Sequence, residues 1–154
     1  CQRVTAFAIK NCDGKIPLEI KFNDEDLLIL NKYKDNLNNI RSQIDNQNIN
    51  FYIDYIVNSL FEANKYFNDQ EPWKKKDNLI RLNTIVYTTL EIVRKISFLL
   101  YPIIPESSLK ALKIFNISEN EINLSSIENN EYLLKDNNIN KIDILFNKIE
   151  KNND

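Results

Sequence analysis

The chain has 154 residues, enough for one domain that buries roughly 70% of the surface exposed by the unfolded chain. Hydrophobic residues make up 43% and charged residues 27%, as is typical of soluble globular proteins, and the formal net charge of −2 gives no overall attraction to nucleic acid. With no histidine and one glycine, the chain has neither imidazole chemistry nor a glycine-rich phosphate loop.

The first predicted helix covers residues 2–11. Val4, Phe7 and Ala8 share one of its faces, at the spacing of an amphipathic helix. Gly14 follows, and glycine readily takes the left-handed conformation that ends a helix. We therefore expect a short helix that packs one side against the core.

A second helix is predicted to begin at Asn23 and Asp24, after a connector that Pro17 keeps extended. Asparagine and aspartate side chains accept hydrogen bonds from the free N–H groups of a first turn, so they cap a helix start. Apolar residues then recur at steps of three and four, namely Leu27, Leu30, Tyr33, Leu37, Ile40 and Ile44. This stripe predicts one face directed at the core.

The third predicted helix starts near residue 51 and ends near Gln70, because Pro72 is poorly placed to continue it. Its expected core face is formed by Ile53, Ile56, Val57, Leu60, Ala63 and Phe67. The helix thus ends shortly before Trp73, the one tryptophan of the chain.

The fourth predicted helix, residues 78–101, has the strongest apolar pattern and is expected to be the central, best-buried helix. Its apolar positions are Leu79, Leu82, Ile85, Val86, Leu90, Ile92, Val93, Ile96, Leu99 and Leu100. Pro102 ends it. After Pro105, which suits a first turn, the apolar residues Leu109, Leu112, Ile114 and Phe115 predict a shorter fifth helix.

Beyond Asn116 the periodicity weakens, so residues 122–134 are expected to hold one or two short helices and residues 137–154 an extended tail. Alternating strand patterns flanked by turn residues are scarce. The predicted fold is an all-α bundle of about five helices with a C-terminal extension. We expect residues 1–115 to form the bundle and residues 116–154 to form the extension.

Several kinds of site and location are not expected. Cys1 and Cys12 do not make a zinc site, and two cysteines suit a reducing compartment. No apolar run is long enough to cross a membrane and no signal peptide is recognisable, so a cytoplasmic protein is expected. The chain also has no methionine, which suggests a piece of a longer protein whose catalytic residues lie elsewhere.

Two interpretations of Trp73 are open from its spacing alone. It lies in the stretch ANKYFNDQEPWKKKD, at a helix boundary and next to three lysines. In one interpretation the indole closes the end of the core and its N–H reaches a carbonyl. In the other the ring is an exposed platform on which an unpaired base stacks, and Lys74, Lys75 and Lys76 hold phosphates rather than simply forming a solvated turn.

The same stretch resembles the anticodon-binding helical domain of methionyl-tRNA synthetases, which are class I aminoacyl-tRNA synthetases. The residues of this resemblance are Ala63-Asn64-Lys65-Tyr66 and Asp69-Gln70-Glu71-Pro72-Trp73. Further stretches that agree in order are Gln2-Arg3-Val4 with Lys10, Asp13 and Gly14, Leu100-Tyr101-Pro102, Ile104-Pro105-Glu106, and Leu145-Phe146-Asn147-Lys148-Ile149-Glu150. The likeness spans nearly the whole chain.

The resemblance implies roles for two residues. Trp73 matches the tryptophan that stacks on the first base of the CAU anticodon, and Arg3 matches the arginine that hydrogen-bonds that base. An asparagine that acts with this arginine would fall two residues before Cys1. The residues themselves also favour Arg3, since it shares a helical face with Lys10 and a guanidinium can read a base edge. A surface salt bridge is the alternative for Arg3.

Supporting roles follow from the same resemblance. Asn64 and Tyr66 are expected to orient the turn that carries Trp73, while Asn68 stands where the family often has aspartate. Phosphate contacts are expected from Lys10 and the three lysines after Trp73, because binding by a chain of net charge −2 must be local. The closing segment, residues 145–150, would fold back toward the catalytic body, with Lys148 in place of an arginine.

The implied parent is a methionine–tRNA ligase that uses ATP to attach methionine to tRNA(Met). The class I signatures His-Ile-Gly-His and Lys-Met-Ser-Lys-Ser cannot occur without histidine and methionine, so this chain alone is expected to be non-catalytic and to hold no cofactor or metal. Expected partners are the anticodon loop and the parent's catalytic domain, with no membrane. Alternatives are the related isoleucyl, valyl or leucyl domain, or a helical protein-docking module in which Trp73 is an interface anchor.

Overall fold

The structure is a helical bundle. In the computed structural model, which describes residues 1–142 and 145, the described chain contains five α-helices, four short 3₁₀ helices and one isolated β-bridge. The α-helices are α1 (Gln2–Asn11), α2 (Asp24–Asp45), α3 (Ile49–Gln70), α4 (Leu79–Leu100) and α5 (Pro105–Leu112). The 3₁₀ helices are η1 (Pro72–Lys74), η2 (Lys113–Phe115), η3 (Glu119–Glu121) and η4 (Leu124–Glu128). The prediction of an all-α bundle of about five helices is confirmed.

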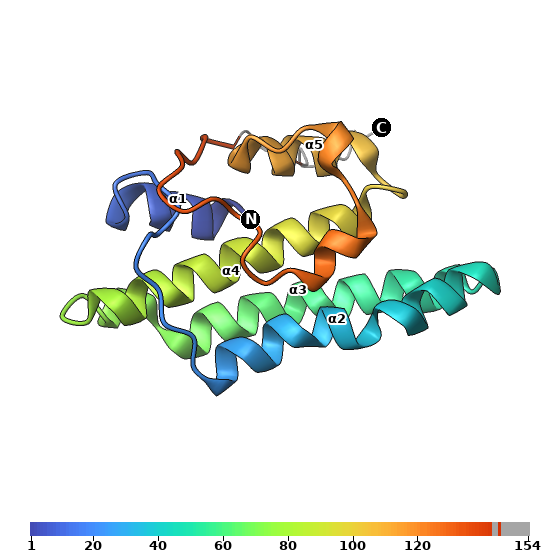
Figure 1. The fold of residues 1–154 in the computed structure, drawn as a ribbon, viewed down its shortest axis with the longest axis horizontal. Helices are drawn as coiled ribbons and strands as arrows, with labels where there is room; N and C mark the ends of the chain where they lie inside the picture. The colour runs from blue at the N-terminus through green and yellow to red at the C-terminus, as the bar shows by residue number, and fades with distance from the viewer. Residues whose placement is uncertain (143–144, 146–154) are drawn as a thin grey trace, which may run out of the picture.

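The helices form two groups on either side of α4. Figure 1 shows α2 and α3 as an antiparallel pair below α4, with the far end of the pair extending beyond the rest of the molecule. The shorter helices α1 and α5 lie above α4. Among the described residues, no helix is both long and apolar enough to cross a membrane.

Caps fix the helix boundaries close to where the sequence predicts them. The Asn23 side chain accepts a hydrogen bond from the Asp26 N–H at 3.0 Å, and the Asp26 carboxylate accepts one from the Asn23 N–H at 2.9 Å. This reciprocal pair satisfies two amides at the start of α2. After α1, Gly14 has a φ of +67°, the left-handed conformation expected there.

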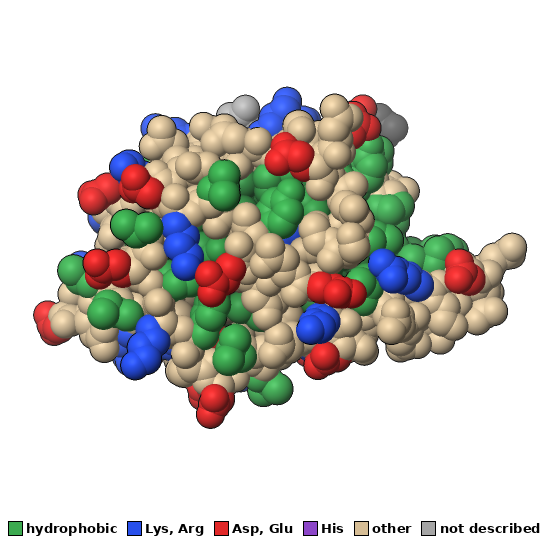
Figure 2. All heavy atoms as spheres, in the orientation of Figure 1, with side chains coloured by type: hydrophobic (Ala, Val, Ile, Leu, Met, Phe, Trp, Pro, Cys, Tyr) green, Lys and Arg blue, Asp and Glu red, His purple; other side chains and the backbone are tan. Residues whose placement is uncertain are grey.

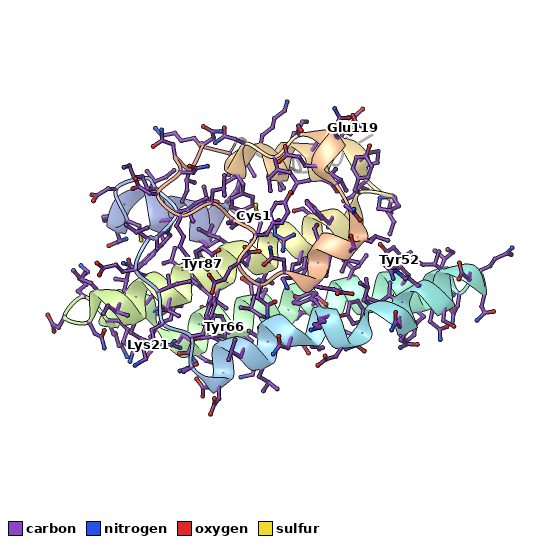
Figure 3. The ribbon with its side chains drawn as sticks, in the orientation of Figure 1. Cys1, Lys21, Tyr52, Tyr66, Tyr87 and Glu119 are labelled. Atoms are coloured by element: carbon purple, nitrogen blue, oxygen red, sulfur yellow. The ribbon has the colours of Figure 1, made fainter. Side chains whose placement is uncertain are left out.

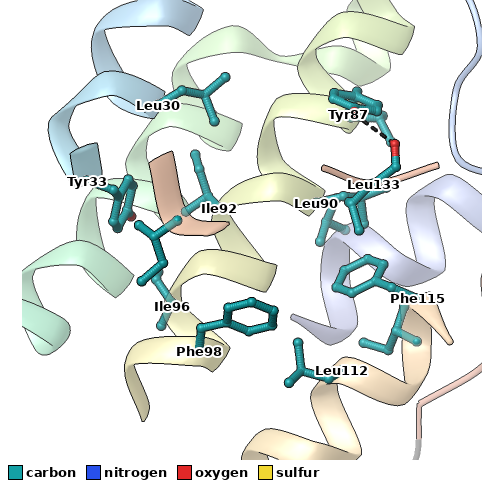
Figure 4. Close-up of a cluster of buried hydrophobic side chains, with 14 of the residues drawn as sticks. Leu30, Tyr33, Tyr87, Leu90, Ile92, Ile96, Phe98, Leu112, Phe115 and Leu133 are labelled. Atoms are coloured by element: carbon teal, nitrogen blue, oxygen red, sulfur yellow. Dashed lines mark hydrogen bonds between the residues drawn. The ribbon is translucent and has the colours of Figure 1, made fainter. Parts of the chain in front are cut away.

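Helix α4 is the central helix, as predicted. Sixteen of its 22 residues are buried, and Figure 4 shows its side chains Leu90, Ile92, Ile96 and Phe98 packed among residues of the other elements. The Tyr87 hydroxyl donates a hydrogen bond to the Leu133 carbonyl at 3.0 Å, which joins α4 to the C-terminal extension. One expected core residue is wrong, because Leu79 lies in the first turn and is exposed.

The predicted core face of α3 is wrong in part. Ile53, Val57 and Leu60 are exposed, whereas Ile56 and Phe67 are buried as expected. The buried face includes Tyr52, Ser59 and Tyr66 instead. The tyrosine rings bury large areas, and the Tyr52 hydroxyl donates to the Leu99 carbonyl, so these residues meet α2 and α4 without losing a polar partner. The predicted core face of α2 also needs correction, because Leu27 is exposed and Asp26 is buried.

Three fully buried charged residues of α4 hold the C-terminal extension in place. Arg94 forms an ion pair of 2.7 Å with Glu91 and donates to the Asn129 carbonyl at 2.9 Å. Lys95 donates to the Ile127 carbonyl at 2.6 Å. Burial and then the charge of Arg94 lower the pKa of Lys95 to about 7, although Glu91 acts in the opposite direction.

The C-terminal extension contributes to the same core as the bundle. Its buried residues Ile117, Ile127, Leu133 and Ile139 belong to that core cluster. The Ile139 N–H donates to the Gly14 carbonyl at 2.7 Å, so the chain returns to the connector after α1. Within residues 122–134 the structure has one short helix, η4, and η3 immediately precedes that range. Most of the predicted closing segment, 145–150, lies outside the described residues.

Candidate nucleic-acid interface

Trp73 lies in the tight turn between α3 and α4. Helix α3 ends at Gln70, and Glu71 takes a left-handed conformation with φ of 45°. Pro72 then occupies the first position of η1 and is buried, which anchors the turn. The Trp73 side chain is 37% exposed, and its ring N–H has no hydrogen-bond acceptor among the described residues. The ring is therefore a rim aromatic with an open side.

Arg3 lies against Trp73. Its guanidinium carbon is 5.3 Å from the centre of the Trp73 ring and 5.3 Å from the centre of the Phe67 ring. The Phe67 ring meets Trp73 edge to face at 6.1 Å and Phe7 at 5.7 Å. One nitrogen of the guanidinium, Nη1, donates to the Asn68 side-chain oxygen at 2.5 Å. The structure thus brings together two of the predicted site residues from α1 and η1.

The hydrogen-bond partner of Arg3, Asn68, is uncharged, so Arg3 keeps its positive charge. Among the described residues Arg3 forms no ion pair, so the hydrogen bond to Asn68 orients the guanidinium without neutralising it. A guanidinium has five N–H donors, and among the described residues the side-chain hydrogen bond of Arg3 to Asn68 uses Nη1 alone. Positive charge and free N–H groups are therefore available beside the indole.

A buried polar network holds the helix ends beneath this turn. Asp26, at the start of α2, accepts from the Tyr66 hydroxyl and from two nitrogens of Arg81 at 2.6 and 3.0 Å. Arg81, at the start of α4, also donates to the Gln70 side chain. Figure 3 shows Tyr66 near the beginning of α2. Burial and then the hydrogen bond to Asp26 raise the pKa of Tyr66, so its hydroxyl stays protonated and remains a donor.

The lysines after Trp73 lie on the surface. Lys74 forms an exposed ion pair of 2.8 Å with Glu71, while Lys75 and Lys76 are exposed without an ion pair to the described residues. Lys10, in the last turn of α1, is also exposed. Surface pairs of this kind contribute little to stability, so Lys74 can exchange Glu71 for a phosphate at small cost.

Asn64 is exposed one helical turn before Phe67. It lines a pocket that is also bordered by Arg3 and Phe67, rather than the turn of Trp73. The expectation that Asn64 orients that turn therefore stays a prediction without a contact to support it. Tyr66 reaches the helix ends beneath the turn through Asp26, as described above.

Sequence reasoning missed Phe67, Asp26 and Arg81 as parts of the site. Phe67 was assigned to the core stripe, and it lies both in the core and under the guanidinium of Arg3. Asp26 had a usable signal, because its spacing from Asn23 is that of a reciprocal cap. Arg81 had no usable signal, since the residues around it at the start of α4 form no motif that points to a buried ion pair.

Comparisons with known proteins identify the family of this chain. A family model described as the anticodon binding domain of methionyl tRNA ligase matches residues 16–154, a region that begins after Arg3. The methionine–tRNA ligase of Brucella suis is 34% identical over 117 residues, which cover 75% of this chain and 23% of that protein. The ligase of Mycobacterium leprae is 33% identical over 125 residues, which cover 78% of this chain and 23% of that protein.

Solved structures give the same result. The apo form of Mycobacterium tuberculosis methionyl-tRNA synthetase superposes with a TM-score of 0.88 and 27% identity, covering 97% of this chain and 31% of that one. Another structure of that enzyme is bound by methionyl-adenylate. The chain spans less than a quarter of the length of the two ligases named above, and it matches their C-terminal, non-catalytic part. These matches do not favour an isoleucyl, valyl or leucyl domain. The chain belongs to the family of anticodon-binding domains of methionyl-tRNA ligases.

Proposed function

We propose that this domain recognises the CAU anticodon of tRNA(Met) by stacking its first base, a cytosine, on Trp73 while Arg3 hydrogen-bonds the base edge. The observation that carries the proposal is the placement of the Arg3 guanidinium 5.3 Å from the centre of a ring that is 37% exposed. Stacking of a base on an aromatic ring is worth about 1–3 kcal/mol, and it requires only an accessible ring face. Single-stranded loops are the RNA elements that offer unstacked bases.

The chemistry of the guanidinium favours cytosine. Arginine has only donors, and its two parallel N–H groups need two adjacent acceptors. On its pairing edge cytosine offers the N3 and O2 acceptors side by side, whereas uracil places an N–H donor at N3. Arg3 would therefore form two hydrogen bonds with cytosine and meet an unmatched donor on uracil. The hydrogen bond from Arg3 to Asn68 already orients the guanidinium, which lowers the entropic cost of ordering it when the base binds.

Phosphate contacts would come from the exposed lysines around the turn. Lys74, Lys75 and Lys76 follow Trp73 directly, and Lys10 lies on α1 with Arg3. Each neutralised phosphate adds affinity that falls as the salt concentration rises. Asn64, which is exposed on α3, is a further candidate contact. Because the chain as a whole has a formal net charge of −2, attraction to the RNA would come from these local positive charges.

In the full-length protein, this domain would select the tRNA for a catalytic domain that attaches methionine to it using ATP. The enzyme of Mycobacterium tuberculosis has been solved bound by methionyl-adenylate, a compound that forms from methionine and ATP. Those steps belong to the part of the ligase outside this chain. We also propose that residues 116–154 form the extension that meets the catalytic body.

Titration of the chain with RNA hairpins tests the recognition. The chain contains one tryptophan, so its emission reports on Trp73 alone. A hairpin with a CAU loop should quench the emission, and a hairpin with UAU should quench it less at equal concentration. Equal quenching by both loops would contradict base recognition. Absence of quenching up to high RNA concentration, with the same loops also failing in a filter-binding assay, would overturn the proposal.

A further inference from the structure

Arg3 lies at the start of α1, a short helix whose position depends on the rest of the fold. The helix has 10 residues, and helices of this length are marginal in water without tertiary contacts. Its buried residues are Val4, Thr5 and Ala8, and the helix packs against α4. Apolar contacts are not directional, so they hold α1 on the bundle without fixing its tilt.

Directional contacts act at the other end of α1. Residues 14–16, in the connector after the helix, pair with residues 136–139 of the C-terminal extension, and we call these two segments together the clasp. Its three backbone hydrogen bonds join the Ile139 N–H to the Gly14 carbonyl at 2.7 Å, the Ile16 N–H to the Asn137 carbonyl at 2.8 Å and the Asp136 N–H to the Ile16 carbonyl at 2.8 Å. In Figure 1 this part of the extension, coloured red, runs beside the connector.

The extension is anchored to the bundle on both sides of the clasp. Before the clasp, the Leu133 N–H donates to the Glu91 carboxylate of α4 at 2.6 Å. After it, the Asn140 N–H donates to the Ile114 carbonyl of η2 at 3.0 Å. Between these two anchors, Ile139 is 7% exposed and belongs to the core. The clasp is therefore a fixed point to which the end of α1 is attached.

The length of α1 makes this fixed point important for Arg3. Arg3 and Asn11, the last residue of the helix, are 8 positions apart, which is about 12 Å along a helix axis. A tilt of about 5° at the clasp end would therefore move Arg3 by about 1 Å. Hydrogen bonds to a base edge need about 2.7–3.2 Å between heavy atoms, so a shift of that size is enough to lose them.

We infer that the clasp is a positioning element for base recognition, because it fixes the end of α1 and thereby places the backbone of Arg3 beside Trp73. Phe67 and Asn68 orient the guanidinium, whereas the clasp places the helix that carries it. This inference rests on the proposed function, since the placement of Arg3 serves recognition only if Arg3 reads a base.

The charges around the clasp favour this indirect role over a direct contact with RNA. Figure 2 shows basic and acidic side chains interspersed over the face that includes this part of the extension. A surface that binds phosphates needs locally concentrated positive charge. Within the clasp, Lys15 forms an ion pair of 2.9 Å with Asp136. The clasp is thus expected to act on recognition through the position of Arg3.

Proline substitutions in the 154-residue chain test the clasp. Ile139→Pro removes the N–H that donates to the Gly14 carbonyl. The ratio of CAU to UAU hairpin affinities should then fall by about 5-fold or more, as expected for loss of a paired base contact, while both hairpins still quench Trp73. In hydrogen–deuterium exchange, the amides of α1 should exchange several-fold faster and those of α4 at the unaltered rate.

Asn138→Pro is the matched control. Asn138 is exposed, and its N–H has no hydrogen-bond acceptor among the described residues, so this proline removes no backbone hydrogen bond of the clasp. Neither the hairpin preference nor the exchange of α1 should change in this variant. If circular dichroism shows that Ile139→Pro loses the fold, Ile139→Ala compared with Asn138→Ala applies the same criteria, because it retains the N–H and shortens the buried side chain.

Two results would overturn the inference. One is a folded Ile139→Pro variant in which the exchange of α1 or the hairpin preference is unchanged. The other is equal acceleration of exchange in α1 and α4, which would make the clasp a general stabiliser of the bundle. If the unaltered chain showed no preference for CAU, the proposed function would fail, and the exchange of α1 would still decide whether the clasp fixes this helix.

Discussion

At the scale of single residues, the proposed recognition gives Arg3 and Trp73 different roles. The indole offers an apolar surface that any base can use, and the guanidinium offers donors that fit only some base edges. Phe67 supports both, since its ring contacts the Trp73 ring at 6.1 Å and the Arg3 guanidinium at 5.3 Å. This support limits how far Arg3 can move when a base arrives. In this proposal, affinity comes mainly from the ring, and discrimination mainly from the arginine.

Arg3→Lys separates these two contributions. Lysine retains the positive charge but cannot form the paired hydrogen bonds, so we expect the preference for CAU over UAU hairpins to fall by about 1–3 kcal/mol. Stacking on Trp73 should persist, and both hairpins should still quench its emission. Lys10→Arg is a matched control on the same helix and should keep the preference. An unchanged preference in Arg3→Lys would show that another group reads the base.

At the scale of elements, two buried polar clusters fix how the helices meet. The cluster around Asp26 joins the start of α2, the end of α3 and the start of α4 beneath the turn of Trp73. The cluster formed by Glu91, Arg94 and Lys95 joins α4 to the C-terminal extension. Both clusters depend on their ion pairs and hydrogen bonds, because a buried charge that loses its partner is costly.

Asp26→Asn should destabilise the bundle strongly. The change leaves the half-buried Arg81 without its counter-ion and weakens the acceptor for the Tyr66 hydroxyl. We expect the free energy of unfolding in urea to fall by about 3–5 kcal/mol. Asp24→Asn is the control, since Asp24 is exposed in the same turn and its change should cost about 0.5 kcal/mol or less. Equal effects of the two changes would contradict the role of the network.

Lys95 should give the stability a measurable pH dependence. Its pKa is lowered from 10.5 to about 7 in the folded chain, so above pH 7 the unfolded chain binds more protons at this site. Stability should therefore rise with pH, by at most about 1.4 kcal/mol per pH unit from this group. Urea unfolding between pH 7 and about 8.5 measures the slope below the range where tyrosines ionise.

Replacement of Lys95 isolates its share of that slope. In Lys95→Met the titrating group is absent, so the rise attributed to it should disappear, whatever the absolute stability of the variant. Lys110→Met, at an exposed lysine of α5, should keep the slope of the unaltered chain. If Lys95→Met kept the same slope, Lys95 would not be the titrating group.

At the scale of the whole molecule, the sequence predicted the helices well and their packing less well. Caps and prolines act locally, so Asn23, Gly14 and Pro72 mark boundaries that the structure reproduces. The buried side of α3 depends on which neighbours it meets, and an apolar pattern that is wide enough for two faces does not say which one is covered.

The buried charged residues and the contacts of the site also depend on tertiary packing, so local sequence patterns did not predict them. Periodicity assigns charged residues to the solvent, so Glu91 and Lys95 could not be placed in the core without knowing that residues 127–133 bring backbone carbonyls and amides to them. Arg3 and Trp73 were paired through a resemblance, because 70 positions separate them in the sequence. Their contact depends on how the fold places α1 and η1 on either side of Phe67.

The most direct test of the account uses Trp73→Ala in the full-length ligase. Methionine activation, measured by ATP–pyrophosphate exchange, should be unchanged, because the proposal assigns activation to the catalytic domain. Aminoacylation of tRNA(Met) should lose about 5- to 150-fold in kcat/KM, which corresponds to the 1–3 kcal/mol of a base stacked on an aromatic ring. Unchanged aminoacylation by a folded variant would contradict the account, and so would an equal loss of both activities.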